Sequence, residues 1–273
     1  MKVGIGLPLD EDILLDRQAG NQYKCINSSY KLVGKPFVIC DKKSKKWKKL
    51  FCCVEKPFKK LHDCTDLPRH CDSGTYKIYP GSSAGFNIYC DNRKYWWNVF
   101  QRGGVRRIFG DNEFWLGNKL IDQLTLSRTY RLYVRMKSRE GIWKTALYKV
   151  FRVGDATNGY TLEVEDYNKT EDDAGDSISS GLPEYINNGM KFSTYDRDND
   201  NHNTSNCAEK YKGAWWFNAC YVSHLNGVYD QNLIYPFGIQ WENSPEPYVS
   251  VSWKSGGLVE LNKNTQIYVL YYF

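Results

Sequence analysis

Short apolar and aromatic stretches, separated by clusters of turn-forming residues, dominate the chain from Asp63 onward. The stretches are rich in Val, Tyr, Trp and Phe, and Gly, Asn and Asp gather between them. They read YKIY, FNIYC, WWNVFQR, YRLYVRM, ALYKVFRV, TLEVEDY, YVSVSW and QIYVLYY. Runs of this length and composition, bounded by turn residues, are typical of strands. The pattern predicts a mainly antiparallel β domain over residues 63–273.

Helical periodicity is weak and is confined to two segments of that domain. It shows around DNEFWLGNKLIDQLT and again near NCAEKYKG, where Asn206 is a good N-cap for a short helix. Between Asp166 and Asn203, acids, Asn, Ser and Gly dominate, and apolar residues are few. A long irregular stretch inside a compact domain is usually functional. We therefore expect the functional site in this stretch.

The N-terminal part of the chain has a different texture. Residues 1–24 show no strong period and are expected to form a tail, whereas residues 25–62 are rich in Lys and hold four cysteines. A segment this short cannot build a core without crosslinks. Its pattern, KCINSSYKLVGKPFVICDKKSKKWKKLFCC, resembles the second half of a complement-control (sushi) module. The resemblance implies that Cys25 pairs with Cys52 or Cys53, and that Cys40 needs another partner.

The positive charge of the chain is local. The net charge is +6, and the segment from Asp41 to Lys60 has nine lysines against two acids, which leaves the rest of the chain at −1. Only Trp47 lies within the run from Lys42 to Lys49, so the aromatic and arginine pattern of a nucleic-acid module is missing. The lysines form either a solvated face or a surface that attracts anionic glycans or membranes.

Nine cysteines without any C-x-x-C pair favour disulfides and an extracellular protein. Asn27, Asn168 and Asn203 each begin an N-x-S/T sequon, which agrees with secretion and glycosylation. The N-terminus lacks the apolar core of a signal peptide, so we expect a mature or truncated form or a misplaced gene start. No apolar run approaches the length of a transmembrane helix, and no membrane span is expected.

Eight sequence blocks in order carry a family resemblance over residues 63–273. They are DCTDLP, YCDN with WWNVFQR, NEFWLGN, YRLYVRM, AGDSIS, FSTYDRDNDN, NCAEKYKGAWWFNACYVSHLNGVY and GIQW. Together they resemble the fibrinogen-related domain shared by fibrinogen chain ends, ficolins, tachylectins, tenascins and angiopoietins. The resemblance implies an α+β fold. Its expected form is a β-rich, fibrinogen C-terminal-like domain with a twisted antiparallel sheet, short helices and long functional loops.

The resemblance also implies two disulfides, Cys64 to Cys90 and Cys207 to Cys220. A loop of the second size would stabilise the fold by about 3 kcal/mol in the chain-entropy model. Five cysteines remain, so one is free or bonds another chain and would be a device for homo-oligomerisation. Cys71 is unusual for the family, which favours a bridge from it to the N-terminal segment.

The run YDRDNDNHNTSNC, residues 195–207, has the composition of a cation site. Asp198 and Asp200 are two apart, so in an extended loop their carboxylates point the same way. Hard oxygen ligands of this kind suit Ca²⁺ far better than zinc or copper. The resemblance places a calcium here, with acidic ligands at Asp198 and Asp200 and carbonyl ligands at His202 and Thr204.

One extra residue before Cys207 leaves the carbonyls of Asn203 and Ser205 as alternative ligands. An EF-hand is excluded because Asn203 stands where its loop requires glycine. The remaining alternative is a solvated Asn/Asp turn that carries a glycan on Asn203.

Acetyl-binding members of the family hold a methyl group between aromatic rings and the acetyl carbonyl at backbone NH groups of a cis peptide. By resemblance, the matching positions are Tyr211, the Ala219-Cys220 bond, Tyr221, Tyr235 and Tyr248. Tyrosine faces and hydroxyls suit a sugar or acetyl group. Ordinary packing is the alternative for Tyr211 and Tyr235.

Two departures limit what the resemblance implies about binding. Family members often have His where Tyr221 stands, which puts the polar contact at that position in doubt. Tyr211 and Pro236 replace the acids of fibrinogen's peptide-binding hole, so clotting-type polymerisation is not expected. For Trp215 and Trp216 we expect packing.

Catalytic motifs are absent from the sequence. The four histidines lie in no nucleophile or metalloprotease motif. His62, Cys64, His70 and Cys71 resemble a zinc cluster in composition, but the resemblance assigns Cys64 to a disulfide. We therefore expect a secreted, non-catalytic, calcium-binding lectin that recognises acetylated or N-acetyl glycans on microbial or cell surfaces. The alternative is a protein-binding module of the angiopoietin or tenascin kind.

Overall fold

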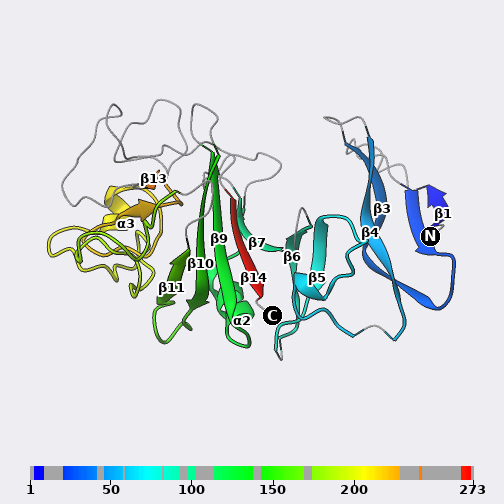
Figure 1. Ribbon diagram of the computed structural model, residues 1–273, viewed down its shortest axis with the longest axis horizontal. Helices are drawn as coiled ribbons and strands as arrows, with labels where there is room; N and C mark the ends of the chain where they lie inside the picture. Colours follow the sequence, from blue (N-terminus) through cyan, green and yellow to red (C-terminus); the bar gives the residue numbers. More distant parts are fainter. Residues whose placement is uncertain are drawn as a thin grey trace. The chain divides into compact units, whose positions relative to one another are not determined.

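The computed structural model describes residues 3–8, 21–41, 46–57, 59–81, 83–92, 97–102, 114–137, 143–168, 174–227, 240–241 and 266–271. The chain divides into two compact units, Met1–Asn98 and Val99–Phe273, and Figure 1 labels many of their elements. The change of sequence texture at Asp63 falls inside the first unit. A domain boundary at that residue stays a prediction.

The first unit contains a four-stranded antiparallel sheet in the order β1-β2-β3-β4. Its strands are β1 (Val3–Pro8), β2 (Asn21–Cys25), β3 (Tyr30–Asp41) and β4 (Lys46–Glu55). Part of the expected tail therefore lies in strands. The strand β2 pairs with β3, and β1 pairs with β2. The backbone amides and carbonyls of β1 and β2 are therefore satisfied by neighbouring strands, and the pattern of side chains in the sequence does not show this pairing. The side chains of the lysine run lie outside the described residues.

A short 3₁₀ helix and a hairpin complete the first unit. The helix η1 (Cys64–Asp66) begins at Asp63, whose carboxylate accepts a hydrogen bond from the Thr65 amide at 2.8 Å. The hairpin joins β5 (Gly74–Ile78) to β6 (Phe86–Asp91). Buried and exposed residues alternate along β5, as expected for a strand with one covered face.

Four disulfides connect eight of the nine cysteines, and both pairs implied by the resemblance are among them. They are Cys25–Cys53, Cys52–Cys71, Cys64–Cys90 and Cys207–Cys220. The structure selects one of the two partners expected for Cys25, and it confirms the bridge from Cys71 to the N-terminal segment. Cys40 is the ninth cysteine, and its side chain lies outside the described residues. A role for Cys40 in oligomerisation stays a prediction.

The second unit is built on an antiparallel sheet in the order β11-β10-β9-β14 (Figure 1). Its strands are β9 (Tyr130–Lys137), β10 (Trp143–Val153), β11 (Leu162–Asn168) and β14 (Gln266–Tyr271). All four were predicted from their apolar patterns. A further strand, β7 (Trp97–Arg102), spans the division between the units and pairs with β8 (Phe114–Trp115). The predicted strand YVSVSW lies outside the described residues.

The helix α2 (Asn118–Thr125) lies against β10 and buries Ile121 and Leu124. It confirms the helix expected in the second half of the segment DNEFWLGNKLIDQLT. In the first half of that segment, Phe114 and Trp115 form the strand β8 instead. The Phe-Trp pair is better suited to a pleated edge than to a helix, and Gly117 separates the two elements.

The stretch from residue 174 to 206 is irregular, as predicted, apart from the isolated bridges Ser193↔Trp215 and Thr194↔Arg197. It leads into α3 (Cys207–Lys210), which Asn206 caps by accepting hydrogen bonds from two first-turn amides at 2.8 and 3.1 Å. The small ladder of β12 (Ser223–His224) and β13 (Gln240–Trp241) follows. Among the described residues, no helix is long and apolar enough to cross a membrane.

Candidate functional site

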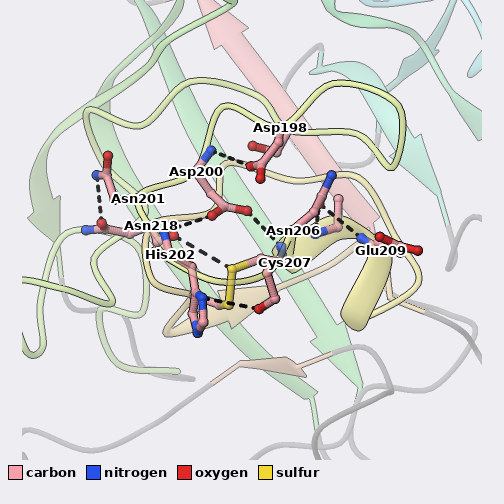
Figure 2. The surroundings of a disulfide bond; sticks show 12 residues. Asp198, Asp200, Asn201, His202, Asn206, Cys207, Glu209 and Asn218 are labelled. Carbon is pink, nitrogen blue, oxygen red and sulfur yellow. Dashed lines mark hydrogen bonds between the residues drawn. A yellow bond between two sulfur atoms is a disulfide. The ribbon is translucent and has the colours of Figure 1, made fainter.

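The acidic loop at residues 198–207 folds around its own carboxylates (Figure 2). Asp198 Oδ1 accepts a hydrogen bond from the Asp200 amide at 3.1 Å. Asp200 Oδ1 accepts one from the His202 amide at 2.9 Å, and its Oδ2 accepts one from the Cys207 amide at 2.8 Å. Aspartates that bind amides two residues onward form tight turns, which explains why alternating acids fold this way. The loop is thereby attached to the first residue of α3.

The Asp198 carboxylate lies close enough to Asp200 to influence the pKa of Asp200. Partial burial is the main cause that raises the pKa of Asp200, and the neighbouring Asp198 carboxylate raises it further. The hydrogen bonds from the Cys207 and His202 amides act in the opposite direction and lower the pKa. A divalent cation at this point would offset the repulsion between the acids. The residues present therefore fit a calcium ion, which prefers such oxygen ligands.

The turn that follows the acids contains both sets of candidate carbonyl ligands. The ring of His202 is engaged inside this turn: its Nδ1 accepts a hydrogen bond from the Thr204 amide at 3.4 Å and lies 3.2 Å from Ser205 Oγ. His202 was expected to act through its carbonyl, so a ring engaged elsewhere is compatible with that role. The choice between the carbonyls of His202 and Thr204 and those of Asn203 and Ser205 stays a prediction.

A buried asparagine, Asn218, connects the acidic loop to the expected ligand pocket (Figure 2). The Asn201 amide donates to the Asn218 carbonyl at 3.2 Å, and the Asn201 side chain donates to Asn218 Oδ1 at 2.9 Å. Asn218 Nδ2 in turn donates to the carbonyls of Pro183 and Ile186 at 2.8 and 3.2 Å. Sequence reasoning missed this residue, because an asparagine in an aromatic segment gives no signal of its many partners.

The peptide bond between Ala219 and Cys220 is cis, as the resemblance implied. The Ala219 amide donates to the carbonyl of Glu184 at 2.8 Å and is therefore used within the protein. Among the described residues, no acceptor lies opposite the Cys220 amide. Cys220, rather than Ala219, offers a backbone donor to a ligand.

Aromatic rings cluster beside this bond. The rings of Tyr211 and Tyr221 meet edge to face, with centroids 4.9 Å apart. Phe217 lies 5.8 Å from Tyr221 and 4.9 Å from the ring of His224. Both tyrosines are half-buried, whereas Phe217 and His224 are fully buried. We call Tyr211, Phe217, Tyr221 and His224 the tyrosine cluster.

His224 is the fully buried histidine of this cluster, and sequence reasoning did not place it there. Burial lowers the pKa of its imidazole to about 3, so the ring is neutral at physiological pH. Neither ring nitrogen has a hydrogen-bond partner within the described residues. Its only sequence signal is its position four residues after Cys220.

The remaining expectations divide as follows. Trp215 and Trp216 are each 2% exposed and serve packing, as expected. Tyr235 and Tyr248 lie outside the described residues. The three sequon asparagines, Asn27, Asn168 and Asn203, are all exposed, and their glycosylation stays a prediction.

A zinc site at the first unit has no support among the described residues. Cys52, His70 and Cys71 place ligand atoms within 4.8 Å of one another. However, Cys52 and Cys71 form a disulfide, and Cys64 is bonded to Cys90. Because a thiolate is needed to bind the metal, these sulfurs are not available to it.

The fold and the site together define a disulfide-bonded, β-rich domain with an acidic loop and an aromatic cluster. Residues 60–256 match the family described as fibrinogen beta and gamma chains, C-terminal globular domain. The chain belongs to this family. The match begins close to Asp63, where the sequence texture changes.

Relatives and solved structures agree with this assignment. Fibrinogen-like protein 1 of Rattus norvegicus is 36% identical over 205 residues, which is 66% of this chain and 63% of the relative. Fibrinogen C domain-containing protein 1 of Homo sapiens is 37% identical over 63% of this chain and 40% of its own length. The chain therefore spans less than two thirds of these relatives.

The fibrinogen-like globe domain of human ANGPTL2 has a TM-score of 0.64 and 29% identity, and covers 77% of this chain and 98% of its own. That of human ANGPTL6 has the same TM-score with 26% identity, and covers 81% and 99%. These similarities confirm the predicted β-rich fold.

Proposed function

We propose that the protein is a secreted, calcium-binding recognition protein that binds acetylated sugars without catalysing a reaction. One observation carries the proposal: the Asp198–Asp200 loop, the Cys207–Cys220 disulfide and Asn218 support the same tyrosine cluster. Calcium would supply charge neutralisation for the two acids. The protein's own groups do the binding.

Each part of the cluster has a role in holding an acetyl group. The half-buried rings of Tyr211 and Tyr221 offer apolar surface to a methyl group. The Cys220 amide is a donor available for the acetyl oxygen. Because a single site of this kind binds one sugar weakly, useful avidity needs several copies, and Cys40 is the candidate crosslink between them.

Secretion is part of the same proposal. Four disulfides form readily only in an oxidising compartment, and all three sequon asparagines are exposed. The lysine-rich segment before residue 60 is a second candidate contact, for anionic glycans.

Retention of the protein on an N-acetylglucosamine resin tests the proposal. We expect retention in calcium, elution by free N-acetylglucosamine or by a chelator, and loss of retention in Tyr211→Ala. Lys149→Gln is the control, because its side chain lies on β10 in an exposed pair with Asp166 at 3.7 Å. Retention that ignores both the chelator and Tyr211→Ala would contradict the proposal.

A protein-binding module is the second candidate function. It is favoured by the similarity to the globe domains of ANGPTL2 and ANGPTL6, and by Tyr195, which is 77% exposed beside the acidic loop. Exposed aromatic residues are frequent anchors of protein interfaces. Capture of a protein partner that tolerates Tyr211→Ala but fails with Tyr195→Ala would favour this function.

A further inference from the structure

A pocket of about 360 Å³ lies at the N-terminal end of α2. Its walls come from residues 115–120, from residues 159–160 and from the chain between Phe192 and Asn199. None of the tyrosine cluster lines it. The volume lies near the lower end of the range of about 300–1,000 Å³ that is usual for small-molecule sites. It is large enough for a single small ring.

The charge of the pocket is positive. Lys119 and Arg197 are the charged residues in its lining, and none of the described lining residues is acidic. Both side chains are exposed, and within the described part of the chain neither forms an ion pair. Two cations in the lining of a pocket attract an anion.

The N-terminal end of α2 adds backbone donors to the pocket. Gly117 is the N-cap residue at φ +93°, and no side chain caps the helix. A Cβ added at Gly117 would meet nothing within 4 Å, so the space beside the first-turn amides is open. Such amides favour anions. Asn118, the first residue of the helix, is also in the lining.

The remaining wall of the pocket is aromatic, and packing and a hydrogen bond fix its position. Trp115 is half-buried and stacks on Phe192, with centroids 6.0 Å apart and planes 15° apart. Tyr160 has a positive φ of 56°, and its carbonyl accepts a hydrogen bond from Trp216 Nε1 at 2.7 Å. A flat aromatic wall beside polar groups suits the CH face of a sugar ring.

We propose that this pocket binds an acidic sugar, that is, a sugar ring that carries a carboxylate or a sulfate group. The oxyanion contacts Lys119, Arg197 and the first turn of α2. The ring lies on Trp115. This site is separate from the proposed acetyl site, because none of its lining residues belongs to the tyrosine cluster.

Isothermal titration with glucuronic acid and with galactose 6-sulfate tests the inference, since neither probe carries an acetyl group. Glucose, galactose and inorganic sulfate are the reference ligands. We expect at least one acidic sugar to bind about tenfold more tightly than its neutral parent, because the charged hydrogen bonds are absent in the parent. The two probes show whether carboxylate or sulfate is preferred. Raising the ionic strength should weaken the binding.

The double variant Lys119→Gln with Arg197→Gln should lose about this tenfold preference while keeping its thermal unfolding midpoint, because both residues are exposed. Lys210→Gln is the matched control. Its ammonium lies 5.2 Å from the ring centroid of Tyr211, outside the pocket, and should leave the preference intact.

Three results would overturn the inference: equal binding of acidic and neutral sugars, an unchanged preference in the double variant, or inorganic sulfate binding as tightly as the preferred acidic sugar. Tyr211→Ala should not affect glucuronic acid or galactose 6-sulfate. Failure of the acetyl site and failure of this pocket are therefore distinguishable.

Discussion

The two units of the chain use their disulfides for different purposes. In the unit Met1–Asn98, three disulfides connect short strands and loops. In the unit Val99–Phe273, a sheet and α2 supply a large core, and the one disulfide among the described residues lies in the irregular site region instead. Crosslinks replace core burial where the unit is small. In the larger unit, the crosslink holds a loop that the core does not cover.

Removal of one disulfide from each unit gives the largest expected effects. Replacing Cys64 and Cys90, which are 26 residues apart, by Ala should lower the free energy of unfolding by about 3.5 kcal/mol in the chain-entropy model. Replacing Cys207 and Cys220, 13 residues apart, should lower it by about 3 kcal/mol. Urea unfolding measures both changes.

Calcium binding separates the two variants. The Cys207–Cys220 variant should also bind calcium and N-acetylglucosamine more weakly, since Cys207 donates its amide to Asp200. The Cys64–Cys90 variant should bind both as the parent does. If the two variants lose calcium affinity equally, the disulfides do not differ in purpose as we infer.

The variant Asp200→Asn tests whether calcium stabilises the second unit through the acidic loop. A saturating ligand at 100 times its dissociation constant stabilises a protein by about 2.7 kcal/mol, and this calcium-dependent gain should disappear in the variant. Thermal unfolding with calcium and with a chelator measures it.

Asp196→Asn is the control for charge and position. This exposed acid belongs to the same alternating run, but its Oδ1 accepts a hydrogen bond from Thr194 Oγ1 at 2.6 Å, on the other side of the turn. The variant Asp196→Asn should keep the calcium-dependent gain in stability. A calcium response that survives Asp200→Asn would exclude the loop as the metal site.

The fold was largely predictable from local sequence because its strands carry their own signals. The runs that form β9, β10, β11 and β14 combine apolar residues with strand propensity. The strands β1 and β2 were missed, because their order depends on pairing with β3 rather than on a period of their own.

The site was predictable only where residues act within a short span. Asp198 and Asp200 are separated by a single residue, so the sequence alone shows that their carboxylates lie close together. The partners of Asn218, the buried position of His224 and the pocket at Lys119 and Arg197 each depend on segments far apart in the sequence. No local pattern contains that information.

Just below neutral pH, the smallest of the expected effects is a pH dependence that His224 should give the second unit. Its pKa in the folded state is about 3, below its usual value of 6.5, because burial disfavours the charged ring. Between these values the unfolded chain binds more protons than the folded one. Stability should therefore fall as the pH drops from 6.5 towards 3, by up to about 1.4 kcal/mol per pH unit. His224→Phe keeps a ring against Phe217 and should remove this slope, whereas replacing the exposed His70 of the first unit by Gln should leave it. Urea unfolding at several pH values measures the slope. An equal slope in His224→Phe would show that the slope does not come from His224, and that the tyrosine cluster does not depend on a neutral imidazole at this position.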